Sequence, residues 1–241
     1  MDTSKKEHTD SHPSGLFSRI RSGVRALLDR AAYWSPSGYD ARKFWQQRLG
    51  TFGLDDLRGA GIMHYSHEKN KATYERAAKT FLNFCAAEGV RFPDVRVLEV
   101  GCGTGFYTDI CAVQRVHTYV GVDVADVLFD QLCKRFPDYA FQQLDVASQE
   151  LSGAYDLIIM IDVTQHIVSP EAFMFAMRNL RDHLAKGGII IMTSWLSERP
   201  RKVFYEVSRT LSTYQKEFEG FVFGAPRPFR DKYIFSMRAP R

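Results

Sequence analysis

The chain has 241 residues, of which 45% are hydrophobic and 25% are charged, as is ordinary for a globular protein. Its 32 basic and 28 acidic residues leave a net charge of +4, which is too small to predict a nucleic-acid-binding surface. No apolar run reaches the roughly 18 residues of a membrane-spanning helix, and no secretory leader is expected. The four cysteines lack metal-ligand spacing, so we expect free thiols, no metal site and a cytoplasmic protein.

The N-terminal part of the chain divides at residue 16. Residues 1–15 are polar and without periodicity, which predicts a disordered tail. Over residues 16–34, apolar residues recur at helical spacing and arginines fill the positions between them. This basic amphipathic helix is a candidate for peripheral contact with a membrane surface or a partner. A helix packed on its own domain, or a loosely held arm, explains the same pattern, so the role of this helix stays open.

Residues 35–94 are predicted to form a helical segment in front of the first strand. Residues 35–38 (Ser-Pro-Ser-Gly) break the chain. Helical patterns follow over residues 40–49 and 68–88, separated by a glycine-containing loop.

The segment Val97–Gly105 (VLEVGCGTG) is the strongest motif in the chain. A buried strand over residues 95–100 runs into a turn with glycine at every second position, and a helix follows over residues 106–113. The spacing differs from the Gly-x-Gly-x-x-Gly fingerprint of dinucleotide sites, and no Gly-Lys-Ser/Thr of a phosphate loop is present. Glu99 has the wrong charge for a pyrophosphate, but it suits a ligand with an ammonium or sulfonium group.

Three later strands are each predicted to end at an acid. They cover residues 118–124 with Asp123, residues 140–146 with Asp145, and residues 155–162 with Asp162. The carboxyl ends of parallel strands form the edge where open α/β sheets bind ligands. Asp123, 18 residues after Gly105, lies where a nucleotide-binding sheet places the acceptor for ribose hydroxyls. Asp145 alternatively caps a turn.

The loop after the strand that ends at Asp162 contains Gln165 and His166. His166 has a suitable pKa to take a proton from a hydroxyl, and Gln165 is a candidate for a polar substrate contact. Alternatively, His166 only holds the loop in place by hydrogen bonding.

The C-terminal part of the chain is predicted to complete the sheet. A helix starts at Ser169-Pro170 and ends at Gly187-Gly188. The further elements expected are a strand over 189–195, a helix within 199–218, and final strands over 221–223 and 232–237. Arg227 and Arg230 fall in a loop before the last strand, where we expect them to be exposed; contact with an acidic substrate group is the alternative.

The pattern Glu-x-Gly-x-Gly-x-Gly after a hydrophobic strand, with acids at the following strand ends, resembles class I S-adenosylmethionine-dependent methyltransferases over about residues 95–195. The resemblance implies an α/β, Rossmann-like seven-stranded sheet with helices on both faces and an antiparallel last strand. It also implies a helical N-terminal cap over residues 35–94, a methyltransferase core over residues 95–241, S-adenosylmethionine as cofactor and S-adenosylhomocysteine as product.

The resemblance also implies roles for residues of the site. Glu99 would face the aminocarboxypropyl end of the cofactor, Asp123 the ribose and Asp145 the adenine. The expected cofactor-binding residues are Glu99, Gly101, Cys102, Gly103, Gly105, Asp123, Val124, Asp145, Val146 and Asp162. Because segments before the first strand commonly line the substrate pocket in this family, the expected substrate-binding residues are Tyr65, Tyr74, Gln165 and His166.

The absence of two sequence motifs narrows the class of molecule that accepts the methyl group. It has no Asp/Asn-Pro-Pro-Tyr/Phe motif and no Pro-Cys pair, so we expect neither an adenine nor a cytosine methyltransferase, and no nucleic-acid partner. The leading hypothesis is methyl transfer to a hydroxyl of a small molecule, such as a sugar, a glycan precursor or a secondary metabolite. The alternatives are N- or C-methylation of a natural product or lipid, a nicotinamide-dependent oxidoreductase, and a non-catalytic partner protein that binds S-adenosylmethionine.

Overall fold

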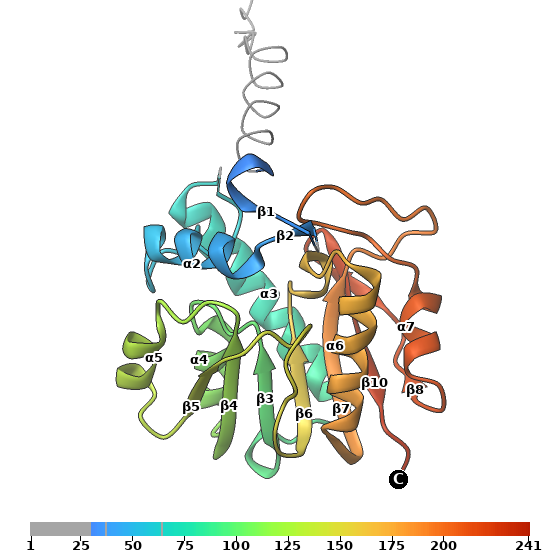
Figure 1. Cartoon of the computed structure of the whole chain (residues 1–241). Coiled ribbons are helices and arrows are strands. Elements are labelled where there is room, and N and C mark those ends of the chain that lie inside the picture. Colours follow the sequence, from blue (N-terminus) through green and yellow to red (C-terminus); the bar gives the residue numbers. More distant parts are fainter. Residues whose placement is uncertain (1–29, 37, 64) are drawn as a thin grey trace, which may run out of the picture.

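The computed structural model describes residues 30–36, 38–63 and 65–241, and it forms a central sheet with helices on both faces (Figure 1). The predicted tail over residues 1–15 and most of the predicted helix over residues 16–34 lie outside these residues. Within the described part, residues 30–33 are helical, and Trp34 already belongs to strand β1 (Trp34–Ser35), which pairs with β2 (Gly38–Tyr39).

The main sheet has the strand order β5-β4-β3-β6-β7-β10-β8, with the short β9 paired to β10. β3 to β7 are parallel and β10 runs antiparallel to its neighbours, so the predicted Rossmann-like order with an antiparallel last strand is confirmed. β9 is an eighth strand beyond the seven expected. The strands are β3 (Arg96–Val100), β4 (Thr118–Asp123), β5 (Ala140–Gln143), β6 (Tyr155–Met160), β7 (Leu184–Ser194), β8 (Val222–Phe223), β9 (Arg227–Phe229) and β10 (Lys232–Arg238).

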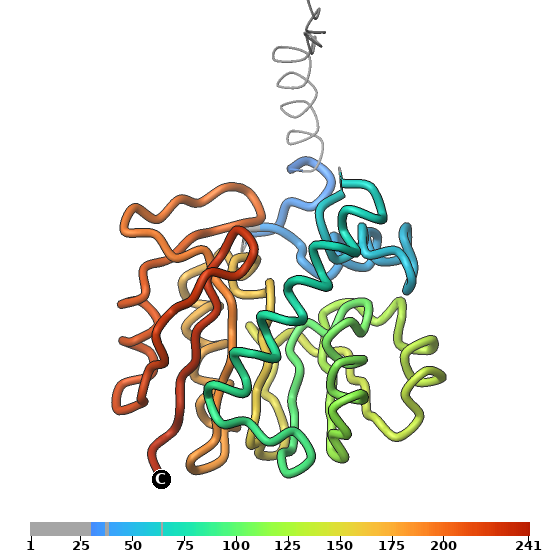
Figure 2. Tube along the Cα trace, turned by 180° about the vertical axis from the view of Figure 1, so that it is seen from behind, coloured from blue at the N-terminus to red at the C-terminus, as the bar shows by residue number. Residues whose placement is uncertain are grey.

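Helices cover both faces of this sheet. α3 and α4 pack on one face, and α6 and α7 pack on the other. In Figure 2, α3 crosses the rear face of the sheet diagonally. The helices are α2 (Ala41–Phe52), α3 (His67–Ala87), α4 (Phe106–Val113), α5 (Phe129–Arg135), α6 (Pro170–Asp182) and α7 (Leu211–Glu217), with short 3-10 helices at Phe92–Asp94 and Thr164–His166. No helix in the described part of the chain is long and apolar enough to cross a membrane.

The alternation of side chains along β3 explains why the sheet is buried on both faces. Val97 packs in the same cluster as Phe81 of α3, whereas Leu98 packs in the cluster that contains Met177 of α6. Neighbouring residues of a strand point to opposite faces, so a central parallel strand needs apolar residues at consecutive positions.

The predicted helix within residues 199–218 is much shorter than expected. Only Leu211–Glu217 is helical, because the Thr210 side chain caps this helix by accepting a hydrogen bond from the Thr213 amide at 3.2 Å. Residues 195–210 form an extended loop, in which the buried Arg209 donates hydrogen bonds to the carbonyls of Thr164 and Ile167.

The predicted end of the preceding helix at Gly187-Gly188 was also wrong. Helix α6 ends at Asp182, and the two glycines lie inside β7.

The cap helix α2 is joined to the loop after β4. The Gln46 side chain donates to the Asp126 carboxylate at 2.9 Å and accepts from the Asp126 amide at 3.1 Å. On the same helix, Leu49 packs in a cluster with Cys102 and Leu132. These contacts hold α2 over the carboxyl ends of β3 and β4.

We expect Leu98→Ala to lower the free energy of unfolding by about 2–5 kcal/mol, because it removes a fully buried side chain from the central strand and leaves a cavity. Urea-induced unfolding measures this change. Lys79→Ala, on the exposed side of α3, is the control and should stay within about 0.5 kcal/mol of the parent. Equal losses in the two variants would contradict the packing described here.

Candidate active site

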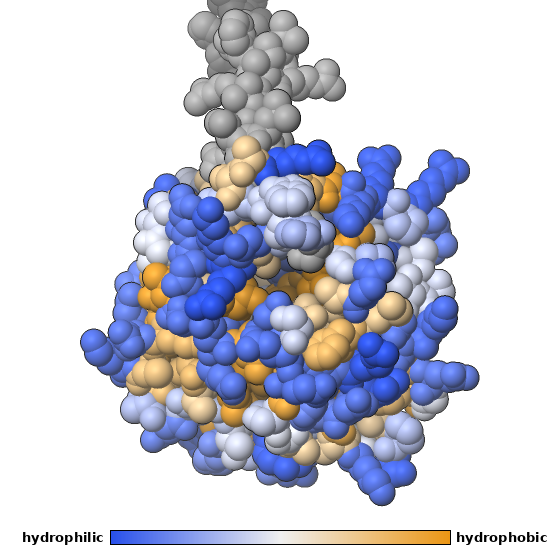
Figure 3. Space-filling view, viewed as in Figure 1, coloured by the Kyte–Doolittle hydropathy of each residue, from blue (hydrophilic) through white to orange (hydrophobic). Residues whose placement is uncertain are grey.

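A pocket lies at the carboxyl ends of the parallel strands, between the sheet and the cap. Figure 3 shows a hollow in the face of the molecule viewed there, with apolar residues inside it. The strand ends contribute the glycine turn, Asp123, Asp145 and residues 161–163 and 166–169, and the cap contributes Tyr39, Trp45 and Tyr74. The position agrees with the general rule for ligand sites in open α/β sheets.

The glycine turn forms one wall of the pocket, which Gly101 and Gly103 line together with Cys102 and Thr104, whereas Gly105 is not part of the lining. Gly101, Gly103 and Gly105 have φ angles of +77°, +49° and +75°, a region that favours glycine. A Cβ atom on Gly101 would lie 2.3 Å from Cγ2 of Val163, so no side chain fits there. A ligand can therefore approach the turn closely.

Asp123 connects the end of β4 to this turn. Its carboxylate accepts hydrogen bonds from the amides of Gly103 and Ala125, both at 2.9 Å. Burial raises the pKa of Asp123 to about 6, although the amide hydrogen bonds oppose this shift. The carboxylate is thus fixed in the pocket wall and ionised at pH 7, where it can accept from hydroxyl groups of a ligand.

Glu99 lies beneath the glycine turn. It is 3% exposed, and its Oε2 accepts hydrogen bonds from the hydroxyls of Thr108 at 3.0 Å and Tyr119 at 2.5 Å. Burial raises the pKa of Glu99 to about 8, so the carboxyl group is mainly protonated at pH 7. A cationic group bound above it would favour the ionised form.

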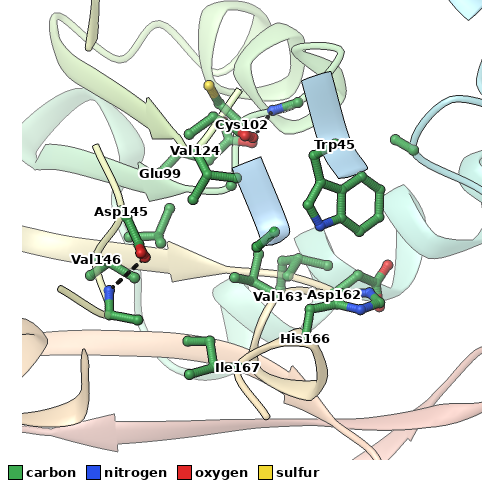
Figure 4. A pocket seen from close by; sticks show the side chains of 18 of the residues that line it. Trp45, Glu99, Cys102, Val124, Asp145, Val146, Asp162, Val163, His166 and Ile167 are labelled. Carbon is green, nitrogen blue, oxygen red and sulfur yellow. Dashed lines mark hydrogen bonds between the residues drawn. The ribbon is translucent and has the colours of Figure 1, made fainter. Parts of the chain in front are cut away.

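Asp145 lies in the turn after β5, on the opposite side of the pocket from Trp45 (Figure 4). Its carboxylate accepts from the amide of Ala147 at 2.9 Å and from the hydroxyl of Ser148 at 2.8 Å. The turn-capping role is therefore present in the structure, and the contact with adenine remains a prediction. Cys102, Val124 and Val146 line the same side of the pocket.

Asp162, at the end of β6, is paired with cations from the β9–β10 hairpin. Its carboxylate contacts the guanidinium of Arg230, and Nζ of Lys232 lies 3.4 Å away. The expectation of an exposed loop residue was wrong for Arg230, whose side chain is 13% exposed and packs over the ring of Tyr74. Arg230 and Lys232 thus balance the charge of Asp162, whose contact with the cofactor stays a prediction.

His166 lies in the pocket lining beside Trp45, with the two ring centres 5.0 Å apart (Figure 4). Its Nδ1 is 3.0 Å from the backbone carbonyl oxygen of Tyr205. Because a carbonyl can only accept, this hydrogen bond requires a proton on Nδ1 and leaves a lone pair on Nε2 of the neutral ring. Burial lowers the pKa of His166 to about 4, so the imidazole is neutral at physiological pH.

The other expected substrate-binding residues do not all reach the pocket. Tyr74 is part of the lining, whereas Tyr65 and Gln165 are not, and the substrate contacts of these residues stay predictions. Gln165 is 2% exposed and points into the protein, because neighbouring residues of a 3-10 turn point about 120° apart. Tyr65 lies before α3, where Nζ of Lys69 covers its ring at 3.7 Å.

The residues that the sequence did not identify come from the cap and from the last hairpin. Tyr39 and Trp45 line the pocket, and Lys232 lies beside Asp162, next to Arg230, which the sequence had named only for a different contact. The aromatic residues at positions 44 and 45 were a local signal for packing, but not for a pocket. Among the described residues, no group of three or more His, Cys, Asp and Glu side chains is arranged to hold a metal ion.

The pocket fits the cofactor that the motif implies. The side-chain-free turn gives room for close approach, Asp123 can accept from ribose hydroxyls, and Glu99 can balance an ammonium group. The carboxyl groups of Asp123 and Glu99 would disfavour the binding of a polyanionic ligand.

Comparisons with known proteins agree with this geometry. A family model described as a methyltransferase domain matches residues 67–226. The chain is 35% identical over 114 residues to the highly reducing polyketide synthase ctvA of Aspergillus terreus, which covers 42% of this chain but only 5% of the synthase. It is 23% identical over 142 residues to a malonyl-[acyl-carrier protein] O-methyltransferase of Bacillus cereus, which covers 58% of this chain and 51% of that enzyme.

Solved structures show the same fold. The N-methyltransferase NodS from Bradyrhizobium japonicum superimposes with a TM-score of 0.58 at 19% identity, over 70% of this chain and 97% of NodS. At this identity the likeness concerns the fold alone.

We expect Asp123→Asn to weaken the binding of S-adenosylhomocysteine about 10- to 100-fold, because it removes a charged hydrogen-bond acceptor from the ribose position. Isothermal titration calorimetry measures the affinity. The exposed Asp138→Asn is the matched control and should bind like the parent. An unchanged affinity of Asp123→Asn would remove Asp123 from the cofactor site.

The raised pKa of Glu99 predicts that ligand binding releases a proton. An ammonium group near Glu99 favours the carboxylate, so the pKa falls on binding and the affinity for S-adenosylhomocysteine should rise from pH 6 to pH 8. Calorimetry at pH 7 in two buffers of different ionisation enthalpy counts the released protons. Glu99→Gln should abolish this release and the exposed Glu75→Gln should not; equal proton counts in all three proteins would disprove the coupling.

Proposed function

Because this chain belongs to the methyltransferase domain family and is a class I S-adenosylmethionine-dependent methyltransferase, we propose that it methylates a hydroxyl group of a small molecule. The observation that carries the proposal is the position of His166 in the pocket lining, where the hydrogen bond of Nδ1 to the Tyr205 carbonyl leaves the lone pair of the neutral ring on Nε2. A sugar, a glycan precursor or a secondary metabolite would present such a hydroxyl. The apolar and aromatic lining around His166 favours an acceptor with an apolar body.

The bound cofactor supplies a methyl group on a positively charged sulfur, which needs no further activation. The residues of this chain then position the acceptor, exclude water and accept its proton. In this proposal, Nε2 of His166 accepts the hydroxyl proton as the oxygen–carbon bond forms, while the Tyr205 carbonyl and Trp45 hold the ring. A base with a pKa of about 4 is weak, but the hydroxyl proton becomes strongly acidic as the oxygen is alkylated.

Carbon methylation is the second candidate, because part of this chain is similar to a polyketide synthase, and polyketide chains contain carbons between two carbonyl groups. A carbon nucleophile needs its proton removed before attack, so the weak base His166 would suit only a carbon acidified by two neighbouring carbonyl groups. An aliphatic amine is protonated at pH 7 and must lose this proton before its lone pair can attack, and a base with a pKa of about 4 is poorly matched to such an ammonium group.

The test is methyl transfer from S-adenosylmethionine with a deuterated methyl group to a panel of acceptors. The panel contains hydroxylated metabolites and sugars, primary amines, and a β-ketoacyl thioester. Mass spectrometry and fragmentation of the products locate the label on oxygen, nitrogen or carbon. Labelling of nitrogen or carbon only would overturn the hydroxyl proposal.

We expect His166→Asn to lower kcat about 10²- to 10⁴-fold and to leave the affinity for S-adenosylhomocysteine unchanged, because the base is lost but the cofactor contacts remain. With saturating S-adenosylmethionine, the kcat of the parent enzyme should stay constant from pH 8 down to pH 6, because the imidazole stays neutral until about pH 4. His117→Asn, at an exposed position, is the control. A rate that falls with a midpoint near pH 6.5, or a kcat equal to that of the control, would contradict this role.

A further inference from the structure

An apolar and basic surface lies where the described chain begins. We call it the Trp34 face; it consists of Arg30, Trp34, Pro36, Lys202, Val203 and Phe204, which line a shallow depression. Trp34 comes from β1, and Lys202 to Phe204 come from the loop over residues 195–210, which rises beside β1 and β2 in Figure 1. Segments far apart in the sequence therefore form one surface.

Two large apolar side chains of the Trp34 face are exposed to solvent. Trp34 is 63% exposed and Val203 is 56% exposed. Single exposed apolar residues are common, but here two of them adjoin one depression. Tryptophan has an apolar ring system and a polar N–H group, and it is enriched at the interface between a bilayer and water.

The charge around these side chains is mainly positive. Arg30, Arg199, Arg201 and Lys202 are all exposed, and Glu198 is the acid in the stretch 198–203. Long cationic side chains can lie along an apolar surface and direct their charges toward anionic groups. The Trp34 face thus combines apolar residues for the acyl boundary with cations for anionic headgroups.

The chain before Arg30 has the same chemical character. In the sequence, Arg19, Arg21 and Arg25 alternate with apolar residues over positions 16–29. This segment is covalently continuous with the Trp34 face, because the described chain starts at Arg30. A planar anionic surface complements an open face of this charge, whereas a small protein partner would need a shaped groove.

We propose that the Trp34 face docks on the surface of a bilayer that contains anionic lipid. The face also adjoins the active site: the ring of Phe204 packs against Tyr39 with centres 5.9 Å apart, and Tyr39 lines the pocket. If the Trp34 face rests on the bilayer, the pocket therefore lies close to the bilayer surface. The proposal does not depend on which atom of the acceptor is methylated.

The test is co-sedimentation of the full-length protein with vesicles of phosphatidylcholine alone or mixed with phosphatidylglycerol. We expect binding to the mixed vesicles that weakens with added salt, and at least 10-fold weaker binding of the double variant Trp34→Ser/Val203→Ser. The matched control is Val113→Ser/Val222→Ser, which changes two valines that are each 71% exposed and lie outside the Trp34 face. Thermal unfolding and affinity for S-adenosylhomocysteine verify that each variant is folded.

Three outcomes would overturn the proposal. The wild-type protein stays in the supernatant with mixed vesicles, which would leave the face to a protein partner. The face variant binds as well as the wild type, which would assign the binding to residues 1–29 alone. The control variant loses as much binding as the face variant, which would show a general effect of surface hydrophobicity.

Discussion

The close approach of the glycine turn to its neighbours is the constraint on which the site depends. Gly101 leaves no room for a side chain against Val163, and Gly105 leaves none against Leu132, where an added Cβ would lie 2.5 Å from Cδ2. The turn is also tied to β4, through the Val122 carbonyl and the Asp123 carboxylate. The ends of β3 and β4, the loop after β6 and helix α5 therefore meet at one short piece of backbone, and the pocket-lining groups of the first three are held together.

Much of this arrangement could be predicted because its determinants are local. The strand, the glycine spacing and the acids at later strand ends each occupy a few consecutive residues, and parallel strands bring their ends to one edge. Arg230 and Lys232 could not be placed this way, because only the antiparallel pairing of β10 with β7 brings them to Asp162. The false helix over residues 199–210 had helical spacing, but tertiary contacts of Phe204 and Arg209 prevailed.

The acceptor side of the pocket illustrates a second limit of sequence patterns. Gln165 and His166 are adjacent and both polar, yet the 3-10 turn buries one and places the other in the lining. Which side chain faces the pocket depends on the backbone conformation of the turn, and the order of residue types does not predict that conformation. The chemistry of His166 depends in turn on burial, because the same imidazole in water would have a pKa near 6.5 instead of about 4.

The hydrogen bond from His166 to the Tyr205 carbonyl has a consequence for control of the enzyme. Tyr205 is two residues from Val203, at the exposed part of the same loop. A displacement of this loop changes the direction of the carbonyl and, through it, the orientation of the imidazole. If His166 is the base proposed above, the orientation of this base is therefore set by a loop that reaches the protein surface, without any contact to the cofactor site.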